Sequence, residues 1–109
     1  MKVISLDEEL YKDKSINTLI LFAIFVLIEE KEKCTFENLV ETCFALFQKR
    51  FSLADHPKWP DSRRLDRPLR TLRKRKLITG GPGTSFSLTK LGKKKALEIA
   101  KSFQQKQLI

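Results

Sequence analysis

Eight basic side chains lie between Arg63 and Lys76, and the segment holds a single acidic residue, Asp66. Guanidinium and ammonium groups bind phosphates and carboxylates, and the planar arginine fork can do so through two parallel hydrogen bonds. A helix surface that is charged only for solubility normally mixes both signs, because like charges at helical spacing repel. The excess indicates that this segment binds a polyanion.

Apolar and basic residues of this segment separate onto opposite sides of a helix. At about 100° per residue, one stripe has the i, i+4, i+7 spacing of a buried face. It consists of Leu65, Leu69 and Leu72, with the stem of Lys76 beside them. The opposite side carries Arg63, Arg67, Arg70 and Lys74. The pattern predicts a helix that buries leucine and presents arginine to solvent.

The start of this helix is open between alternatives. Asp61 or Ser62 can serve as its N-cap. Pro68 lies more than one turn further on, where proline removes a hydrogen bond and kinks a helix. Either the helix bends at Pro68, or the main helix begins with Asp66 as its N-cap and holds Pro68 within its first turn.

The positive charge of the chain is concentrated in its second half. Residues 1–55 hold seven Lys or Arg and ten Asp or Glu, whereas residues 56–109 hold fifteen and three, and the net charge is +9. At this length we expect an N-terminal arm over 1–14 and one domain over 15–109. A basic half on an acidic or neutral scaffold favours binding to DNA or RNA.

The most apolar stretch, from Ile16 to Ile28, predicts a central core helix with Ser15 as its N-cap. Thirteen residues of helix span about 20 Å, short of the roughly 30 Å of a hydrocarbon bilayer core. We therefore expect no membrane association. Two cysteines are fewer than the framework of a small secreted domain normally uses, which favours reduced thiols and a cytoplasmic location. The same helix, together with the C-terminal helix, is a candidate homodimer contact. In the arm, Val3, Ile4, Leu6, Leu10 and Tyr11 are expected to dock on the domain or on a second subunit.

A second helix is expected from Thr35 through about Lys49. Its apolar residues recur at helical spacing and are Leu39, Val40, Cys43, Phe44 and Phe47. Just before it, Cys34 and Thr35 form either a brief strand or a capping turn. In the following loop we expect His56 to be exposed and Trp59 to pin the turn by packing, with stacking on a nucleic-acid base as the alternative.

A hairpin and a last helix complete the expected elements. Two short strands flank the turn at 80–83, with Ile78, Phe86 and Leu88 available to face the core. Thr89 caps a helix over roughly 90–106. Its expected apolar side consists of Leu91, Ala96, Leu97, Ala100 and Phe103.

Metal and redox chemistry have little support in the residue types. The only cysteines are Cys34 and Cys43, and the only histidine is His56, so one chain cannot assemble four zinc ligands. We expect Cys43 to be a small core residue and both thiols to be reduced, with a redox-sensing pair as the alternative. We find no nucleophile with a nearby base and no phosphate-binding glycine loop, and expect neither a cofactor nor an enzyme.

The order helix, helix, basic helix, hairpin, helix resembles the winged helix-turn-helix superfamily over about residues 15–103. The stretch from Phe86 through Thr89 to Gly92 is similar to the strand-to-helix turn of MarR-like and PadR-like small regulators. The resemblance implies an α+β, mainly α fold with a three-helix core, a two-stranded wing and a C-terminal helix. It also implies that the third helix lies in the major groove of double-stranded DNA.

The sequence and the resemblance together predict a sequence-specific DNA-binding protein, a transcriptional regulator associated with the nucleoid. The third helix supplies readout, the wing touches phosphate, and lysines of the last helix add phosphate contacts. The candidate nucleic-acid-binding residues are Arg63, Arg64, Arg67, Arg70, Thr71, Lys74, Thr84, Ser85, Lys90 and Lys93. The wing departs from the superfamily pattern, since its tip has no Arg or Lys to enter the minor groove.

Two other functions fit the same residues. A winged helix can act as an adaptor, in which case the basic helix docks on an acidic protein partner within a larger complex. RNA binding is the third possibility and predicts preference for an RNA hairpin over duplex DNA.

Overall fold

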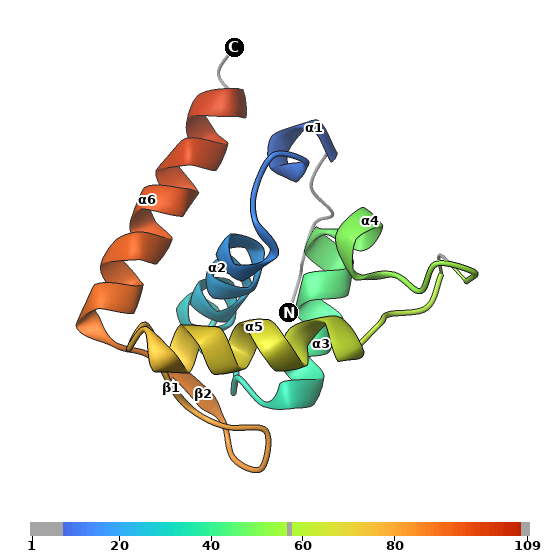
Figure 1. Ribbon diagram of the computed structural model, residues 1–109. Helices are drawn as coiled ribbons and strands as arrows, with labels where there is room; N and C mark the ends of the chain where they lie inside the picture. The colour runs from blue at the N-terminus through green and yellow to red at the C-terminus, as the bar shows by residue number, and fades with distance from the viewer. Residues whose placement is uncertain (1–7, 57, 108–109) are drawn as a thin grey trace.

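The computed structural model describes residues 8–56 and 58–107, with side chains described through residue 103. The expected α+β, mainly α class is confirmed, because the described chain is mostly helical with one small antiparallel sheet (Figure 1). The elements are α1 (Glu8–Tyr11), α2 (Ile16–Glu29), α3 (Phe36–Leu46), α4 (Gln48–Phe51), α5 (Arg63–Lys74), β1 (Ile78–Gly80), β2 (Phe86–Leu88) and α6 (Lys90–Gln107). Among the described helices, none combines the length and apolar character needed to cross a membrane.

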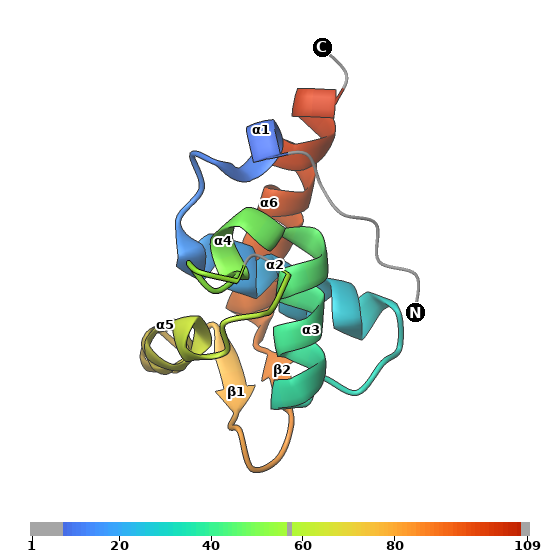
Figure 2. The same cartoon turned by 90° about the vertical axis from the view of Figure 1, so that its right-hand side faces the viewer.

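Helix α2 forms the centre of the fold, as its apolar sequence predicts. Its N-cap is Ser15, whose hydroxyl accepts the backbone N–H of Thr18 at 3.2 Å. Figures 1 and 2 show α2 between α6 and α3, and α5 crosses in front of them in Figure 1. Most apolar side chains of α2 are buried in this core or packed against it. Ile28 is the one exposed large apolar residue of α2. The homodimer contact expected through α2 and the C-terminal helix stays a prediction.

The second expected helix ends earlier than predicted. Helix α3 stops at Leu46, and Phe47 leaves the helical conformation with φ −130° and ψ 56° before the single turn of α4. The break lets Phe47 and Phe51 both enter the core, where they are 0% and 1% exposed. A continuous helix to Lys49 is therefore wrong, because packing of two phenylalanines outweighs local helical periodicity.

The N-terminal arm docks on its own domain where it is described. The Tyr11 ring is buried and meets the Phe47 ring edge-on, with centroids 5.1 Å apart. The Lys14 ammonium donates to the Ser102 hydroxyl, and Arg50 donates to the Lys14 carbonyl at 2.8 Å. These contacts tie α1 to both α4 and α6. The arm residues Val3, Ile4 and Leu6 lie outside the described residues.

The hairpin forms where it was predicted, with Ile78 and Phe86 buried and Leu88 half-buried. Ile78 pairs with Leu88 and Gly80 with Phe86, and Ile78 and Phe86 are 2% and 3% exposed. The Phe86 N–H also donates to the Cys34 carbonyl at 2.8 Å. The chain before α3 therefore adds one strand-like hydrogen bond beside β2, while the Thr35 hydroxyl caps α3 through the Asn38 N–H.

Helix α6 is joined to the end of α5 through its first turn. The Thr89 hydroxyl donates to the Lys76 carbonyl at 2.7 Å and accepts the Gly92 N–H at 3.0 Å, capping the helix as expected. Gly92 packs so closely that an added Cβ would lie 1.9 Å from the Leu77 carbonyl oxygen. The Thr89 to Gly92 turn therefore fixes α6 against the segment that enters the hairpin.

The apolar side expected for α6 is wrong at two leucines. Ala96 and Phe103 are buried, but Leu91 and Leu97 are 49% and 44% exposed. The side of α6 that faces the core instead includes Gly92, which has no side chain. The close approach of Gly92 to Leu77 turns this side of the helix toward the core. Leu91 and Leu97 consequently lie outside the inward face.

The loop between α4 and α5 also differs from its prediction at one residue. His56 is exposed, as expected. Trp59 does not pack into the domain, because it is 60% exposed and its ring stacks on His56 with centroids 4.9 Å apart. The loop is held by its backbone instead, since the Asp61 N–H donates to the Phe51 carbonyl.

Candidate nucleic-acid interface

Helix α5 is one helix from Arg63 to Lys74, and Pro68 lies inside it. The alternative start with Asp66 as N-cap is therefore wrong. Asp61 is the residue that caps the first turn, because its Oδ1 accepts the Arg63 backbone N–H at 3.2 Å and Ser62 makes no side-chain cap. Lys76 was expected beside the leucines, but it lies past the helix end with φ 60° and is exposed.

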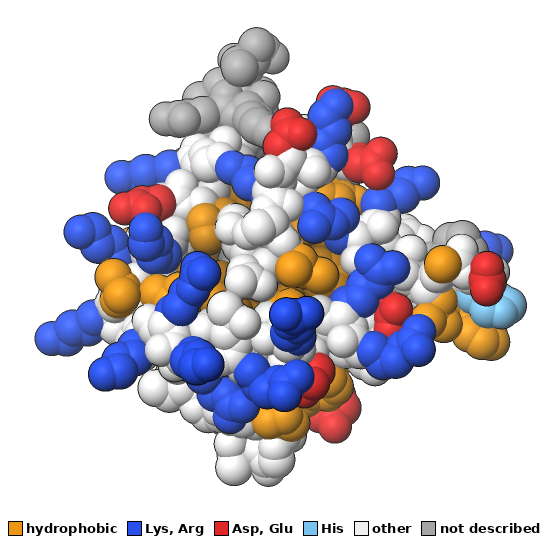
Figure 3. Space-filling view, in the orientation of Figure 1, with side chains coloured by type: hydrophobic (Ala, Val, Ile, Leu, Met, Phe, Trp, Pro, Cys, Tyr) orange, Lys and Arg blue, Asp and Glu red, His pale blue; other side chains and the backbone are white. Residues whose placement is uncertain are grey.

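The two sides of α5 are those that the spacing predicts. The inward side is buried against the core and consists of Leu65, Pro68, Leu69 and Leu72. The outward side, called here the basic stripe, is exposed and consists of Arg63, Arg67, Arg70 and Lys74. Figure 3 shows Lys and Arg side chains gathered over α5 and continuing onto α6 on the same face of the molecule.

A buried carboxylate organises the start of the basic stripe. Asp61 is 7% exposed and accepts hydrogen bonds from Nε of Arg63 at 3.1 Å and Nε of Arg64 at 3.3 Å. Hydrogen bonds from these two guanidinium groups hold the pKa of the Asp61 carboxyl below its usual range, and Arg63 has the larger effect. Arg64 also donates to the Arg50 carbonyl at 3.1 Å. Arg64 therefore braces α5 against α4, and the exposed Arg63 keeps most of its surface for a ligand.

We expect the Asp61→Asn variant to be less stable than wild type by about 1 to 2 kcal/mol near neutral pH, because two charge-assisted hydrogen bonds weaken. The lowered pKa means that the carboxylate stabilises the fold above the pKa of the unfolded chain, and that this stabilisation is lost as pH falls through the folded pKa. The difference between the two proteins should therefore shrink below about pH 4. Urea denaturation at a series of pH values measures the stability difference between wild type and variant. A difference that stays constant down to about pH 3 would contradict the stabilising role of the Asp61 carboxylate.

The remaining cations of the stripe differ in how strongly they are held. Arg70 pairs with Asp66 at 3.1 Å, but both side chains are about two-thirds exposed, and such a pair contributes little free energy. Within residues 8–56 and 58–107, the side chains of Arg67 and Lys74 form no ion pair or hydrogen bond. These three cations are available to an incoming anion.

Arg73 is a residue that the sequence reasoning missed. Its Nη1 donates to the Gly80 carbonyl at 3.3 Å, linking the last turn of α5 to the end of β1. The link sets the hairpin beside the basic stripe, as Figure 2 shows for the two elements at the lower left. A helical wheel could have placed Arg73 at the margin of the stripe, but not against a hairpin carbonyl.

The other predicted contact residues have mixed positions. Thr71 is half-buried and its hydroxyl donates to the Arg67 carbonyl at 3.2 Å, so it is turned toward its own helix. Thr84 is exposed at the hairpin tip, whereas Ser85 is half-buried. Lys90 and Lys93 are exposed in the first turn of α6.

The two cysteines lie away from this surface and are buried free thiols. Burial raises the pKa of the Cys34 thiol to about 12 and raises that of Cys43 well above its ordinary value. Thiolate chemistry is therefore suppressed at both positions. Among the described residues, no three His, Cys, Asp or Glu side chains are grouped as ligands for a metal ion.

Comparison of the chain with family models, with curated proteins and with solved structures gives no match.

Proposed function

We propose that this protein is a winged-helix, sequence-specific binder of double-stranded DNA that acts as a transcriptional regulator and reads the major groove with α5. The observation that carries the proposal is the basic stripe, with Arg67 and Lys74 unpaired among the described residues and Arg70 only weakly paired. A major groove about 12 Å wide admits one helix, and arginine can pair with guanine through two hydrogen bonds.

The arrangement around α5 supports the winged-helix part of the proposal. Helices α2 and α3 precede α5, and the β1–β2 hairpin follows it directly. The hydrogen bond from Phe86 to Cys34 places the chain before α3 beside β2, and Arg73 holds the hairpin next to the helix. A helix and a hairpin fixed in this way would meet DNA as one rigid surface. The uncharged hairpin tip favours phosphate contacts over minor-groove readout.

Fluorescence anisotropy with random-sequence duplex DNA tests the proposal at about 50 and about 200 mM salt. With about six phosphate contacts, affinity should fall by roughly three decades over this range. Selection from a random duplex library should then yield a preferred site that binds at least about 1,000-fold more tightly than random sequence.

Other outcomes would contradict the proposal in distinguishable ways. Failure to bind at about 50 mM salt, together with a defined complex of this chain with an acidic protein, would make it an adaptor. Tighter binding to an RNA hairpin than to a duplex of matched length would make RNA the ligand.

Asp66 should oppose DNA binding, because its carboxylate lies 3.1 Å from the Arg70 guanidinium and would face the phosphates. We expect Asp66→Asn to raise the affinity for random duplex by about two- to ten-fold at low salt, with a smaller gain at high salt. The same anisotropy assay measures the change. The exposed Glu30 provides a matched control, Glu30→Gln, which removes one negative charge at the start of the loop between α2 and α3, on the side of the molecule opposite α5 in Figure 2. An equal gain in both variants would attribute the effect to net charge rather than to the stripe.

A further inference from the structure

The outward face of α3 carries an apolar groove of about 450 Å³ that the described chain leaves open. This surface is called here the α3 groove, and Glu37 and Glu41 in its lining are exposed. The residues that line it are Phe36, Glu37, Val40, Glu41, Phe44, Pro60 and Ser62. The neighbouring Trp59 is 60% exposed. Apolar surface with an accessible tryptophan is typical of an interaction site.

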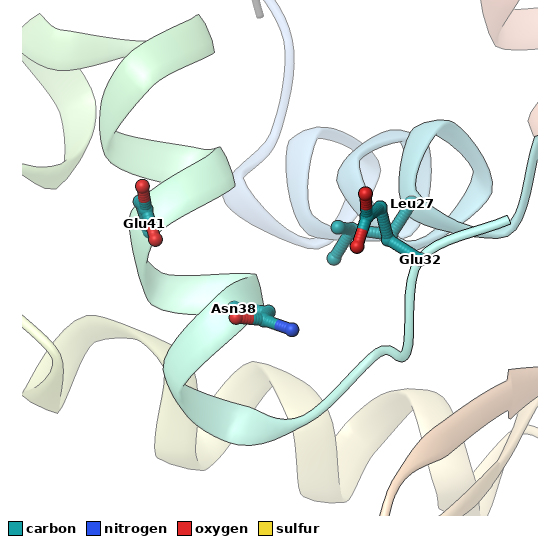
Figure 4. Close-up of a pocket in the computed structure, with 4 residues that line it drawn as sticks. All are labelled: Leu27, Glu32, Asn38 and Glu41. Carbon is teal, nitrogen blue, oxygen red and sulfur yellow. The ribbon is translucent and has the colours of Figure 1, made fainter. Parts of the chain in front are cut away.

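The charged residues that line the groove, Glu37 and Glu41, are both acidic. Helix α3 contains no Lys or Arg, and within the described part of the chain Glu37 and Glu41 form no ion pair. Glu41 also lines a smaller hollow of about 200 Å³ that Glu32 borders from the other side (Figure 4). An occupant that combines an apolar side chain with positive charge would complement the apolar lining and the two glutamates.

The outward face of α6 has this combination. Leu97 is 44% exposed, and helical spacing places Lys94 and Lys101 one turn to either side of it. Both lysines are exposed and, among the described residues, neither is in an ion pair. Their aliphatic stems extend the apolar surface of the leucine while their ammonium groups remain free. This surface is called here the α6 knob.

The α3 groove and the α6 knob lie on opposite sides of one molecule. Figures 1 and 2 agree that α6, α2 and α3 lie side by side, with α2 in the middle. The outward faces of α6 and α3 consequently point away from each other. A chain cannot join its own two surfaces, but an adjacent copy placed beside it can present its knob to the groove.

We propose that the occupant of the α3 groove is the α6 knob of a second copy of this chain. Leu97 of one copy packs between Val40 and Phe44 of the next, and Lys94 and Lys101 pair with Glu37 and Glu41. Each added copy continues the α6, α2, α3 layer. The contact is heterologous, so an open row keeps one free groove at one end and one free knob at the other until a ring closes. It differs from the symmetric dimer expected through α2.

Charge reversal in two complementary variants tests the pairing without DNA. One variant is Glu37→Lys with Glu41→Lys, and the other is Lys94→Glu with Lys101→Glu. Sedimentation velocity of the wild type should show a mass that rises from monomer over about 10 to 500 µM, as for a weak interface. Each variant alone should stay monomeric, because its groove and knob carry the same charge.

Mixing the two variants is the decisive measurement. The lysine-bearing groove of one accepts the glutamate-bearing knob of the other, while the two unchanged surfaces also match, so the mixture should regain the concentration-dependent mass. Both variants keep a net positive charge, so attraction between oppositely charged proteins cannot explain renewed association in the mixture. Trp59, the only tryptophan, should report the same transition by fluorescence. The matched control Leu91→Ser removes an exposed leucine outside the knob and should associate like wild type, whereas Leu97→Ser should not.

Three results would overturn the proposal. The wild type could remain monomeric to about 500 µM; it could form a dimer that neither variant weakens; or the mixed variants could fail to associate although each is folded by circular dichroism. In the first case, binding of a basic amphipathic peptide in the α3 groove would show that the occupant is another protein.

Discussion

Replacing Arg67 and Arg70 together with alanine is expected to lower the affinity for duplex DNA by about 30- to 1,000-fold at low salt. Both side chains lie on the basic stripe, and neither is needed to hold the fold, since Arg67 has no side-chain partner among the described residues and the Arg70 pair with Asp66 is exposed. The estimate corresponds to about 1 to 2 kcal/mol for each arginine. Fluorescence anisotropy with random-sequence duplex measures it.

The salt dependence of this variant separates two roles for the arginines. Loss of two phosphate contacts should reduce the slope of log affinity against log salt by about 2. If either arginine reads a base, each single variant should also relax preference at one position of the selected site. Equal weakening on all sequences would mark both as phosphate contacts.

A matched control removes two positive charges at a distance from α5. Lys31→Gly with Lys33→Ala changes the loop between α2 and α3, which lies on the far side of the molecule from α5 in Figure 2. Glycine suits the φ of 60° at residue 31. This control should lose less than about three-fold in affinity. Equal losses in the two double variants would refute the assignment of binding to the basic stripe.

Gly92→Ala should destabilise the fold by about 3 kcal/mol or more, because the backbone around Gly92 leaves no room for a methyl group. The added Cβ would lie 1.9 Å from the Leu77 carbonyl oxygen, and the atoms in conflict belong to backbone. Backbone cannot yield as a flexible side chain does, so α6 must shift away from the hairpin. Thermal unfolding should show a melting temperature lower by about 10 °C or more.

The control for this prediction is Lys95→Ala, an alanine placed on an exposed position of the same helix. It should change stability by less than about 0.5 kcal/mol. A Gly92→Ala protein as stable as this control would show that α6 does not approach Leu77 as described.

Local signals were enough to predict several elements. Ser15 and Thr35 precede apolar periodic segments, and both cap helices through backbone N–H groups. The glycine-rich turn at 80–83 marks the hairpin, and the leucine spacing of α5 separates its buried side from the basic stripe. Each of these features depends on residues close together in the chain.

The errors came from contacts between distant residues. Phe47 leaves α3 because the core formed by other elements accepts it. Leu97 is exposed because the close approach of Gly92 to Leu77 fixes the rotation of α6. No periodicity within one helix carries that information.

The candidate site was predictable as a surface but not as a set of roles. Helical spacing identified Arg63, Arg67, Arg70 and Lys74 as one face. It could not separate Arg64 from them in function, because its partner is the carbonyl of Arg50, fourteen positions earlier. The role of Arg73 likewise depends on a hairpin carbonyl.

The docking of α1 on α6 has a mechanical consequence. The Lys14 to Ser102 hydrogen bond brings the two ends of the described chain together at the top of Figure 1, while α5 and the hairpin lie at the bottom. A force applied between Glu8 and Gln107 would therefore separate α1 from α6 before it unfolds the core. Held in an optical trap by these ends, the protein would keep its basic stripe open to a DNA strand, and early extension would report the release of α1 alone.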